Sequence, residues 1–276
     1  MPQLRRRGFE VAQAGCGRDG VVLASVLAGL VDPTTAVVSL MHANNETGVL
    51  QPVASAVAAA RAHGALVHID AVQSAGKIPL DVKALGVDLL ALSGHKLNAP
   101  KGVGALFVRR GVRLSPLVTG HQEKNRRGGT ENVASIVGLG LACELAGRDI
   151  SRASAHCLAL RQRLEAGVLR LPGSQLNGHP RQRIPNTAHF SFEGLEGHHL
   201  VVALDLEGFC VSSGPACASG ASTPSYVLTA MGLDPCLAVG SIRVSVGWGT
   251  TDGDVDRFLE ALPKAVARLR AVATPA

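Results

Sequence analysis

The residues best suited to chemistry stand at the end of a short apolar run, Leu89–Leu92, which leads into Ser93-Gly94-His95-Lys96. An apolar run that stops this abruptly, with Pro100 close behind, predicts a buried parallel strand whose carboxyl end carries Lys96 into a crevice. In partly dry surroundings a lysine amine loses some preference for its charged form and becomes suited to forming a Schiff base. For this stretch alone, a solvated surface lysine is the competing interpretation.

Three predicted strands end in polar clusters at one edge of the expected sheet. In chain order, the clusters are Asn44 with Asn45, Asp70 with Gln73, and Ser93 with His95 and Lys96. Ligands of open α/β sheets bind outside the carboxyl ends of the strands. Three such clusters therefore favour a ligand site over the chance placement of one lysine.

Asp70 and His95 each allow two interpretations. Asp70 could cap a helix that starts at Ala71, or its carboxylate could keep the ring nitrogen of a pyridoxal cofactor protonated, so that the ring acts as an electron sink. Gln73, one turn later, could face the same ligand. His95 is either a phosphate donor or an ordinary loop histidine.

Cys217 and Arg243 are candidates in the second half of the chain. Cys217 lies among small residues, in the loop 212–220 after a predicted strand. A buried cysteine is usually an inert hydrophobe, but glycine, proline, alanine and serine around it favour the accessible thiol that thiolate chemistry requires. Arg243 lies within an otherwise apolar predicted strand. Because an unpaired guanidinium there would be costly, we expect it to meet a carboxylate, either a structural partner's or a substrate's.

The composition excludes several classes of protein. The 276 residues are 46% hydrophobic but only 3% aromatic, and the net charge of +6 comes from scattered arginines. Few aromatic side chains and no basic run disfavour nucleic-acid binding. The positive charge suits anionic small ligands. The six cysteines form no C-x-x-C pair, so reduced, cytosolic thiols are the simpler account. No secretory signal is visible and no apolar run approaches the roughly 20 residues of a membrane span. We therefore expect a cytoplasmic protein that binds no membrane.

Strands that alternate with helical segments predict an α/β fold with a mostly parallel sheet. We expect one domain over residues 1–150 and a second over 151–276, with the boundary at the start of a long helix. The predicted strands are Ala36–Met41, Leu66–Ile69, Val87–Leu92, Gly104–Arg109, Thr187–Phe192, Phe209–Val211 and Ser241–Val246. The predicted helices are Val53–His63, Asn132–Ala146, Ser151–Leu171, His199–Leu206 and Asp252–Val272.

Nearly the whole chain resembles the cysteine desulfurases, with the motifs in the order that the family carries them. The matching stretches are Met41–Gly48, His68–Ser74, Ser93–Lys96, His121–Asn132, Ser212–Cys217 and Ser241–Arg243. The stretch from His121 to Asn132 is most similar to the nitrogen-fixation (NifS-type) branch. The resemblance implies a pyridoxal-phosphate-dependent enzyme of fold type I (aspartate-aminotransferase-like). Residues 1–150 would be the remainder of the cofactor-binding large domain, and residues 151–276 the small α+β domain with the cysteine loop.

The resemblance also implies the reaction and the partners. As a cytoplasmic homodimer, the enzyme would remove sulfur from L-cysteine, leave L-alanine, and pass the sulfur to an acceptor or to a scaffold protein for iron–sulfur cluster assembly. Lys96 and Cys217 would be the catalytic residues, Lys96 holding pyridoxal phosphate and Cys217 carrying the sulfur as a persulfide. No resident metal is implied, although the persulfide could transiently ligate an iron–sulfur cluster.

The family's binding residues carry over by position. The cofactor contacts would be Asn45, Asp70 at the ring nitrogen, Gln73 at the ring hydroxyl, Ser93 and His95 at the phosphate, and Thr130 at the phosphate of the other subunit. Asn45 and Arg243 would orient the substrate and bind its carboxylate. Each role is an implication of the resemblance and is an expectation for the structure.

The resemblance starts part of the way into the family's large domain. The family carries an upstream Gly-Thr-Glu-type phosphate loop and a histidine that stacks on the cofactor ring, and neither is found in this sequence. Two enzymatic alternatives use the same scaffold, selenocysteine lyase and a class V aminotransferase, although transamination needs no thiol at Cys217. The remaining alternative is a truncated, inactive remnant or an interaction protein.

Overall fold

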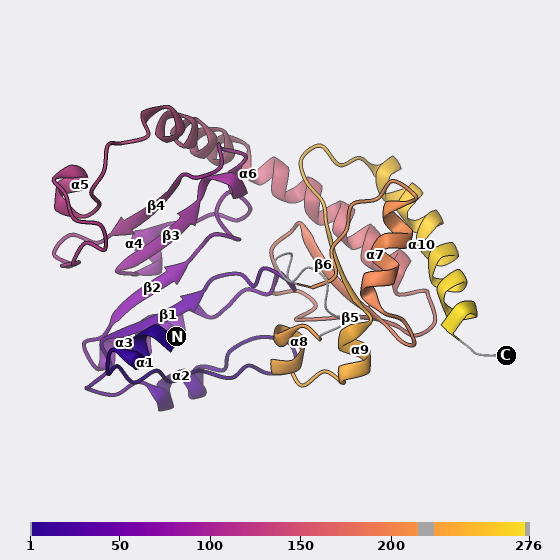
Figure 1. The fold of residues 1–276 in the computed structure, drawn as a ribbon, viewed down its shortest axis with the longest axis horizontal. Coiled ribbons are helices and arrows are strands. Elements are labelled where there is room, and N and C mark those ends of the chain that lie inside the picture. Colours follow the sequence, from indigo (N-terminus) through magenta and orange to yellow (C-terminus); the bar gives the residue numbers. More distant parts are fainter. Residues whose placement is uncertain (1, 215–223, 274–276) are drawn as a thin grey trace.

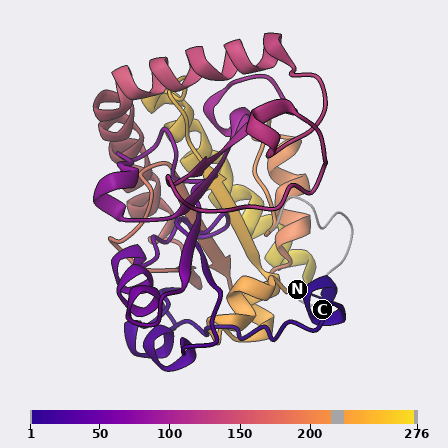
Figure 2. The ribbon, with the colours of Figure 1, turned by 90° about the vertical axis from the view of Figure 1, so that its left-hand side faces the viewer.

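The computed structural model describes residues 2–214 and 224–273, so Cys217 lies outside the described residues. The described chain forms two sheets, and one long helix, α6 (Val133–Val168), extends from the first sheet to the second across the top of Figure 1. Figure 2 views the molecule from the side of the first sheet, with the second sheet behind it. No helix in the described ranges combines the length and apolar character needed to cross a bilayer.

The first sheet has the strand order β1-β2-β3-β4. Its strands are β1 (Val37–Met41), β2 (Leu66–Asp70), β3 (Leu89–Ser93) and β4 (Gly104–Val108). The first three run parallel, and β4 pairs antiparallel with β3. Helix α3 (Val53–Ala62) connects β1 to β2, and the short α4 (Val82–Leu85) precedes β3. The predicted α/β fold with a mostly parallel sheet is therefore confirmed.

Small and branched residues build the core beside this sheet. Along β2, Val67 and Ile69 are buried at alternate positions, as expected for a strand with one face on a core. Helix α3 presents Ala56 and Ala60, both fully buried, at the four-residue spacing of one helix face. Alanine lets a helix approach a sheet closely, which is how a chain with 3% aromatic residues fills this core.

The second sheet is antiparallel and has the order β5-β6-β7. Its strands are β5 (Ser174–Leu176), β6 (Thr187–Phe192) and β7 (Ser241–Ser245), and its core contains residues from α6, α7 (Gly197–Asp205) and α10 (Asp252–Ala273). The expected strand over Phe209–Val211 was wrong. That stretch has no regular secondary structure, and the following Ser212 makes only an isolated bridge to Arg243.

Helix α6 corrects a second expectation, because the two helices predicted at Asn132–Ala146 and Ser151–Leu171 are one continuous helix of 36 residues. Residues 146–151 contain no proline, and Asn132 caps the start of α6 by accepting a hydrogen bond from the backbone N–H of Ser135 over 3.3 Å. The expected domain boundary at residue 151 therefore falls inside α6. The two ends of α6 nevertheless pack in different places: Leu160 and Leu164 lie in the core of the second sheet, whereas Leu139 packs in a separate small cluster near η1 (Gly94–Leu97).

The other described helices are short. They are α1 (Pro2–Arg6), α2 (Ala24–Leu30), α5 (Gln122–Asn125), α8 (Tyr226–Ala230) and α9 (Pro235–Val239). The α8–α9 segment forms a small apolar cluster around Leu228 and Met231, against which Cys16 from the amino-terminal segment packs. The two halves of the chain are thus joined by this contact as well as by α6.

Candidate active site

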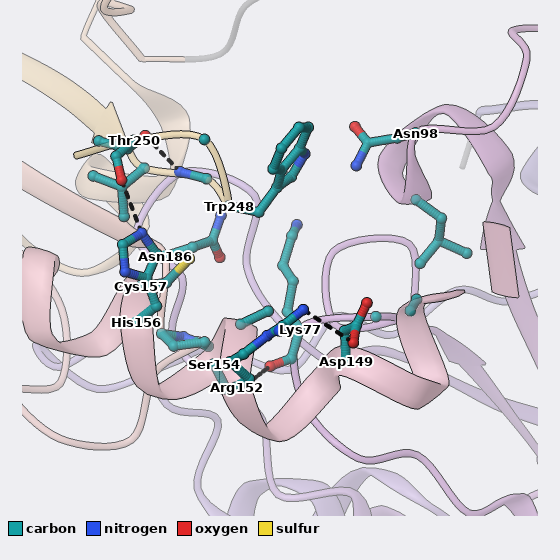
Figure 3. Close-up of a pocket in the computed structure, with 18 of the residues that line it drawn as sticks. Lys77, Asn98, Asp149, Arg152, Ser154, His156, Cys157, Asn186, Trp248 and Thr250 are labelled. Carbon is teal, nitrogen blue, oxygen red and sulfur yellow. Dashed lines mark hydrogen bonds and ion pairs between the residues drawn. The ribbon is translucent and has the colours of Figure 1, made fainter. Parts of the chain in front are cut away.

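A cavity of about 1450 Å³ lies against the middle of α6. Its walls come from the turn after β2 and from η1 on one side, from α6 in the middle, and from the chain that follows β7 on the other side. Lys77 lies between α6 and Trp248, and Asn98 lies across the cavity from them (Figure 3). Because both halves of the chain supply walls, this cavity exists only in the fully folded protein.

Asp70 is fixed at the carboxyl edge of the first sheet. The register pairs it with Met41 of β1 and with Ala91 of β3, and its carbonyl accepts a hydrogen bond from the backbone N–H of His42 over 2.8 Å. Its carboxylate Oδ1 accepts from the backbone N–H of Val72 over 3.0 Å. No helix starts at Ala71, because residues 72–77 form turns, so the expected capped helix was wrong. The hydrogen bond from Val72 instead fixes the direction of the carboxylate at the start of this turn. Its role toward a ring nitrogen stays a prediction.

Lys96 lies on η1, which begins directly after β3. Gly94 makes this close turn possible, because a Cβ there would stand 2.8 Å from Cγ1 and 2.9 Å from the carbonyl oxygen of Val103. Ser93 Oγ lies 2.8 Å from His95 Nδ1, so the two residues expected at a phosphate form one polar unit. Lys96 lines the cavity but is exposed, not partly dry as expected, because the hollow beside it is open.

Lys77 is a site residue that the sequence did not single out. Burial, with further contributions from the charges of Lys96 and Arg243, lowers the pKa of its amine to about 8, while the thiol of Cys157 acts in the opposite direction. Its Nζ donates to the backbone carbonyl of Gln73 over 2.9 Å and to Gln73 Oε1 over 3.2 Å. The signal available in the sequence was the four-residue spacing from Gln73, which allows such a contact in a tight turn.

Arg243 lies on β7 and reaches across to the first half of the chain. Its Nη1 donates to the backbone carbonyl of Asn45 over 2.9 Å. Burial lowers the pKa of this guanidinium, and the nearby carboxylate of Glu46 raises it. Glu46 acts on Arg243 electrostatically, but among the described residues the two form no direct ion pair, and the direct hydrogen bond of Arg243 goes to a carbonyl. The expectation that Arg243 meets a carboxylate therefore stays a prediction. Sequence reasoning placed Glu46 in a motif but gave it no role.

Among the predicted site residues of the described chain, Lys96 alone lines the cavity, and the walls do not include Asn45, Asp70, Gln73, Ser93, His95, Thr130 or Arg243. Thr130 is exposed in the loop before α6 and is absent from the cavity walls. The resemblance assigned it to the other subunit, so its position in one chain leaves that role a prediction. Cys217 lies outside the described residues. The flanking Ser212 is held by Arg243 through backbone hydrogen bonds of 3.2 and 2.6 Å.

The charges at this site fit pyridoxal phosphate. Lys96 and Arg243 both act on Lys77 as like charges. Such a cluster favours a bound anion, which a phosphate group or a substrate carboxylate supplies. Asp70 at the strand edge offers the complementary negative group for a pyridinium nitrogen. The donor set therefore matches the cofactor at both of its ends.

The fold and this site together define the class of fold-type I enzymes, which depend on pyridoxal phosphate. A model of the aminotransferase class-V family matches residues 2–258. Cysteine desulfurase 2 of Trichormus variabilis is 46% identical over 275 residues, covering 98% of this chain and 68% of the relative. Cysteine desulfurase NifS of Azotobacter vinelandii is 43% identical over 271 residues, covering 98% of this chain and 67% of the relative.

Solved structures agree with the sequence matches. A NifS-like protein superposes with a TM-score of 0.90 at 37% identity, over 98% of this chain and 71% of the other. The NifS-like protein from Rickettsia africae gives a TM-score of 0.87 at 30% identity, over 96% of this chain and 72% of the other. The chain belongs to the class-V aminotransferase family and, within it, to the cysteine desulfurases.

Proposed function

We propose that this chain binds pyridoxal phosphate and converts L-cysteine to L-alanine, passing the sulfur on as a persulfide of Cys217. The observation that carries the proposal is that Lys77 and Lys96 line one cavity and that Lys96 and Arg243 both act electrostatically on Lys77, with Asp70 at the carboxyl edge of the first sheet. The names of the relatives support the choice of cysteine as substrate.

Most of the cofactor-holding residues belong to the first half of the chain. Lys96 holds the cofactor covalently through Nζ, Asp70 pairs with the ring nitrogen, and Gln73, fixed by Lys77, faces the ring hydroxyl. Ser93 and His95 bind the phosphate as the polar unit described above. When bound, pyridoxal phosphate supplies an electron sink next to the substrate's α-carbon.

The substrate is held from the second half. Arg243 binds the carboxylate of cysteine, and Asn45, which already engages Arg243 through its carbonyl, orients the amino acid. Lys96 moves the α-proton with the same Nζ. Cys217 attacks the substrate sulfur as a thiolate, so that a sulfur–sulfur bond forms while the carbon–sulfur bond breaks, and the carbon takes a proton to become alanine.

The organisation of the protein follows the same proposal. Residues 1–150 form the cofactor-binding part and residues 151–276 the smaller part with the cysteine loop, which matches the separate apolar cores of the two sheets. In a homodimer, Thr130 reaches the phosphate of the partner subunit. The persulfide passes to an acceptor or iron–sulfur scaffold protein. We place the reaction in the cytoplasm, where thiols stay reduced, in keeping with the free cysteines of the described chain.

The test is an absorbance spectrum of the purified chain after incubation with pyridoxal phosphate and removal of the excess. We expect a yellow protein that releases alanine from L-cysteine. Lys96→Ala is expected to be colourless, whereas Lys101→Ala, which removes an exposed lysine nearby, is expected to stay yellow. Cys217→Ala is expected to keep the colour and lose sulfur transfer. A wild-type chain that stays colourless would contradict the proposal.

Assays with L-selenocysteine separate the desulfurase from its closest alternative. A desulfurase turns over cysteine in a Cys217-dependent way, since the thiol has to accept the sulfur. A selenocysteine lyase would prefer selenocysteine, and an aminotransferase would be indifferent to Cys217→Ala. Either result would contradict the proposed cysteine desulfurase reaction but would not contradict the proposed cofactor site.

A further inference from the structure

Glu46 is a buried acid that the proposed reaction does not use. Glu46 is 0% exposed and lies in the turn 44–48 that follows β1. Its Oε2 accepts a hydrogen bond of 2.5 Å from the hydroxyl of Ser225, 179 positions further along the chain. Its Oε1 has no hydrogen-bond partner among the described residues. A buried carboxyl with one free oxygen is costly to keep charged unless a cation stands near it.

That cation is Arg243. It acts on Glu46 electrostatically, and its Nη1 is hydrogen-bonded to the carbonyl of the adjacent Asn45 over 2.9 Å. Burial raises the pKa of Glu46, whereas the hydroxyl of Ser225 and the charge of Arg243 lower it. These opposed effects leave the carboxyl sensitive to any change in the charge near Arg243.

Within residues 2–214 and 224–273, few groups lie around the pair of Glu46 and Arg243. Ser225 at the start of α8 and Arg243 on β7 act on Glu46, and a Cβ at Gly214 would stand 3.9 Å from Glu46 Oε2. Two further titratable groups act with Arg243: His189 across the strand pair on β6, and Lys77 after β2. Both are basic. In the described part of the chain, Glu46 is therefore the acid that shares the charge of Arg243 with any carboxylate ligand that binds there.

We infer that Glu46 is a positioning residue that takes up a proton when a carboxylate ligand binds Arg243. The inference rests on the proposed role of Arg243 as the carboxylate subsite. A second carboxylate beside Arg243 competes for its charge and repels the charged form of Glu46, which favours the neutral acid. Once Glu46 is neutral, it no longer competes with the ligand carboxylate for the positive charge of Arg243. The protonated carboxyl, which also contacts Ser225, can then donate a hydrogen bond.

The direction of the pH effect follows from linkage. Wherever Glu46 is charged in the free protein and neutral in the complex, binding consumes a proton, so the affinity falls as the pH rises. The fall is at most about tenfold for each pH unit. Ser225→Ala removes a hydrogen bond that favours the charged form. We therefore expect this variant to shift the pH-dependent range of affinity to higher pH.

The experiment is calorimetric titration of the pyridoxal-phosphate-loaded chain with 3-mercaptopropionate, which has the carboxylate and thiol of cysteine but no amine. Titrations in two buffers of different ionisation enthalpy, from about pH 5 to about pH 9, count the protons taken up. We expect uptake of up to one proton in the wild type and none in Glu46→Gln. Glu207→Gln, which removes an exposed glutamate after α7, is the matched control and is expected to behave as the wild type.

The outcomes separate this inference from the function on which it rests. Arg243→Gln is expected to abolish binding of the probe. If it binds the probe as well as the wild type does, or if the wild type does not bind it, the carboxylate subsite is wrong and the inference falls with it. If binding depends on Arg243 but Glu46→Gln takes up as many protons as the wild type, the inference alone is overturned.

Discussion

The amines of Lys77 and Lys96 line one cavity, and the charge of Lys96 contributes to holding the pKa of Lys77 near 8. The two lysines differ in their surroundings. Lys96 is exposed on η1, whereas Lys77 is half-buried and donates two hydrogen bonds to Gln73. One amine is thus free to react, and the other is committed to positioning a neighbour. This division of roles leads to the first prediction.

Lys77→Met is expected to change how stability depends on pH. The pKa of Lys77 is about 8 in the folded chain, against an ordinary value of 10.5, so between these values the unfolded chain binds more protons. The free energy of unfolding of the wild type should therefore rise relative to Lys77→Met as the pH increases through this window, by at most about 3 kcal/mol. Urea denaturation of both proteins at a series of pH values measures this difference in the free energy of unfolding. Lys101→Met, at an exposed position, is expected to show no such difference from the wild type.

His189 should destabilise the protein in acid. Its ring is completely buried on β6, and burial together with the charge of Arg243 lowers its pKa to about 3, from an ordinary value of 6.5. Between these values the unfolded chain binds the additional proton, so the stability of the wild type falls as the pH drops from 6.5. The loss is at most about 1.4 kcal/mol for each pH unit.

The measurement for His189 compares pH slopes. His189→Phe is expected to have a shallower slope of unfolding free energy against pH than the wild type below pH 6.5. His63→Phe removes an exposed histidine after α3 and is expected to keep the wild-type slope. Equal slopes in wild type and His189→Phe would show that the buried ring does not govern acid stability.

Glu165 is expected to be a major determinant of stability. Its Oε1 lies 2.7 Å from Nη2 of Arg183, whose side chain is 0% exposed, and 3.2 Å from Nε of Arg161. Glu165→Ala would leave two buried guanidinium groups without their acid, which costs roughly 3–5 kcal/mol. Glu144→Ala, at an exposed position of the same helix, is expected to cost little. Chemical denaturation compares the two variants, and a similar small loss in both would contradict the prediction.

Arg243→Lys tests the geometry of substrate binding. Lysine keeps the positive charge but cannot offer a planar fork that reaches both the Asn45 carbonyl and a carboxylate. We expect KM for cysteine to rise about tenfold or more, which corresponds to about 1.4 kcal/mol, with a smaller change in kcat. Steady-state kinetics of alanine release provide both constants. Arg113→Lys, at an exposed position, serves as the control, and a drop in kcat alone would argue against a binding role.

The sequence by itself determined which residues end the strands. The apolar runs before Asp70 and before Ser93 predicted β2 and β3, and parallel pairing then placed both ends at one edge of the sheet. This information is local, because a strand's start and end depend on the side chains within it. The order of the motifs likewise predicted the family, and the matched relatives confirm this prediction.

Only the tertiary structure decided what surrounds those strand ends. The burial of Lys77, the hydrogen bond between Glu46 and Ser225 and the reach of Arg243 to Asn45 all join segments that packing brings together. The continuity of α6 was also invisible locally, since packing of its two ends against different cores holds the helix together across residues that looked like a boundary. A pKa depends on burial and on charges from distant segments, so no local pattern could reveal these roles.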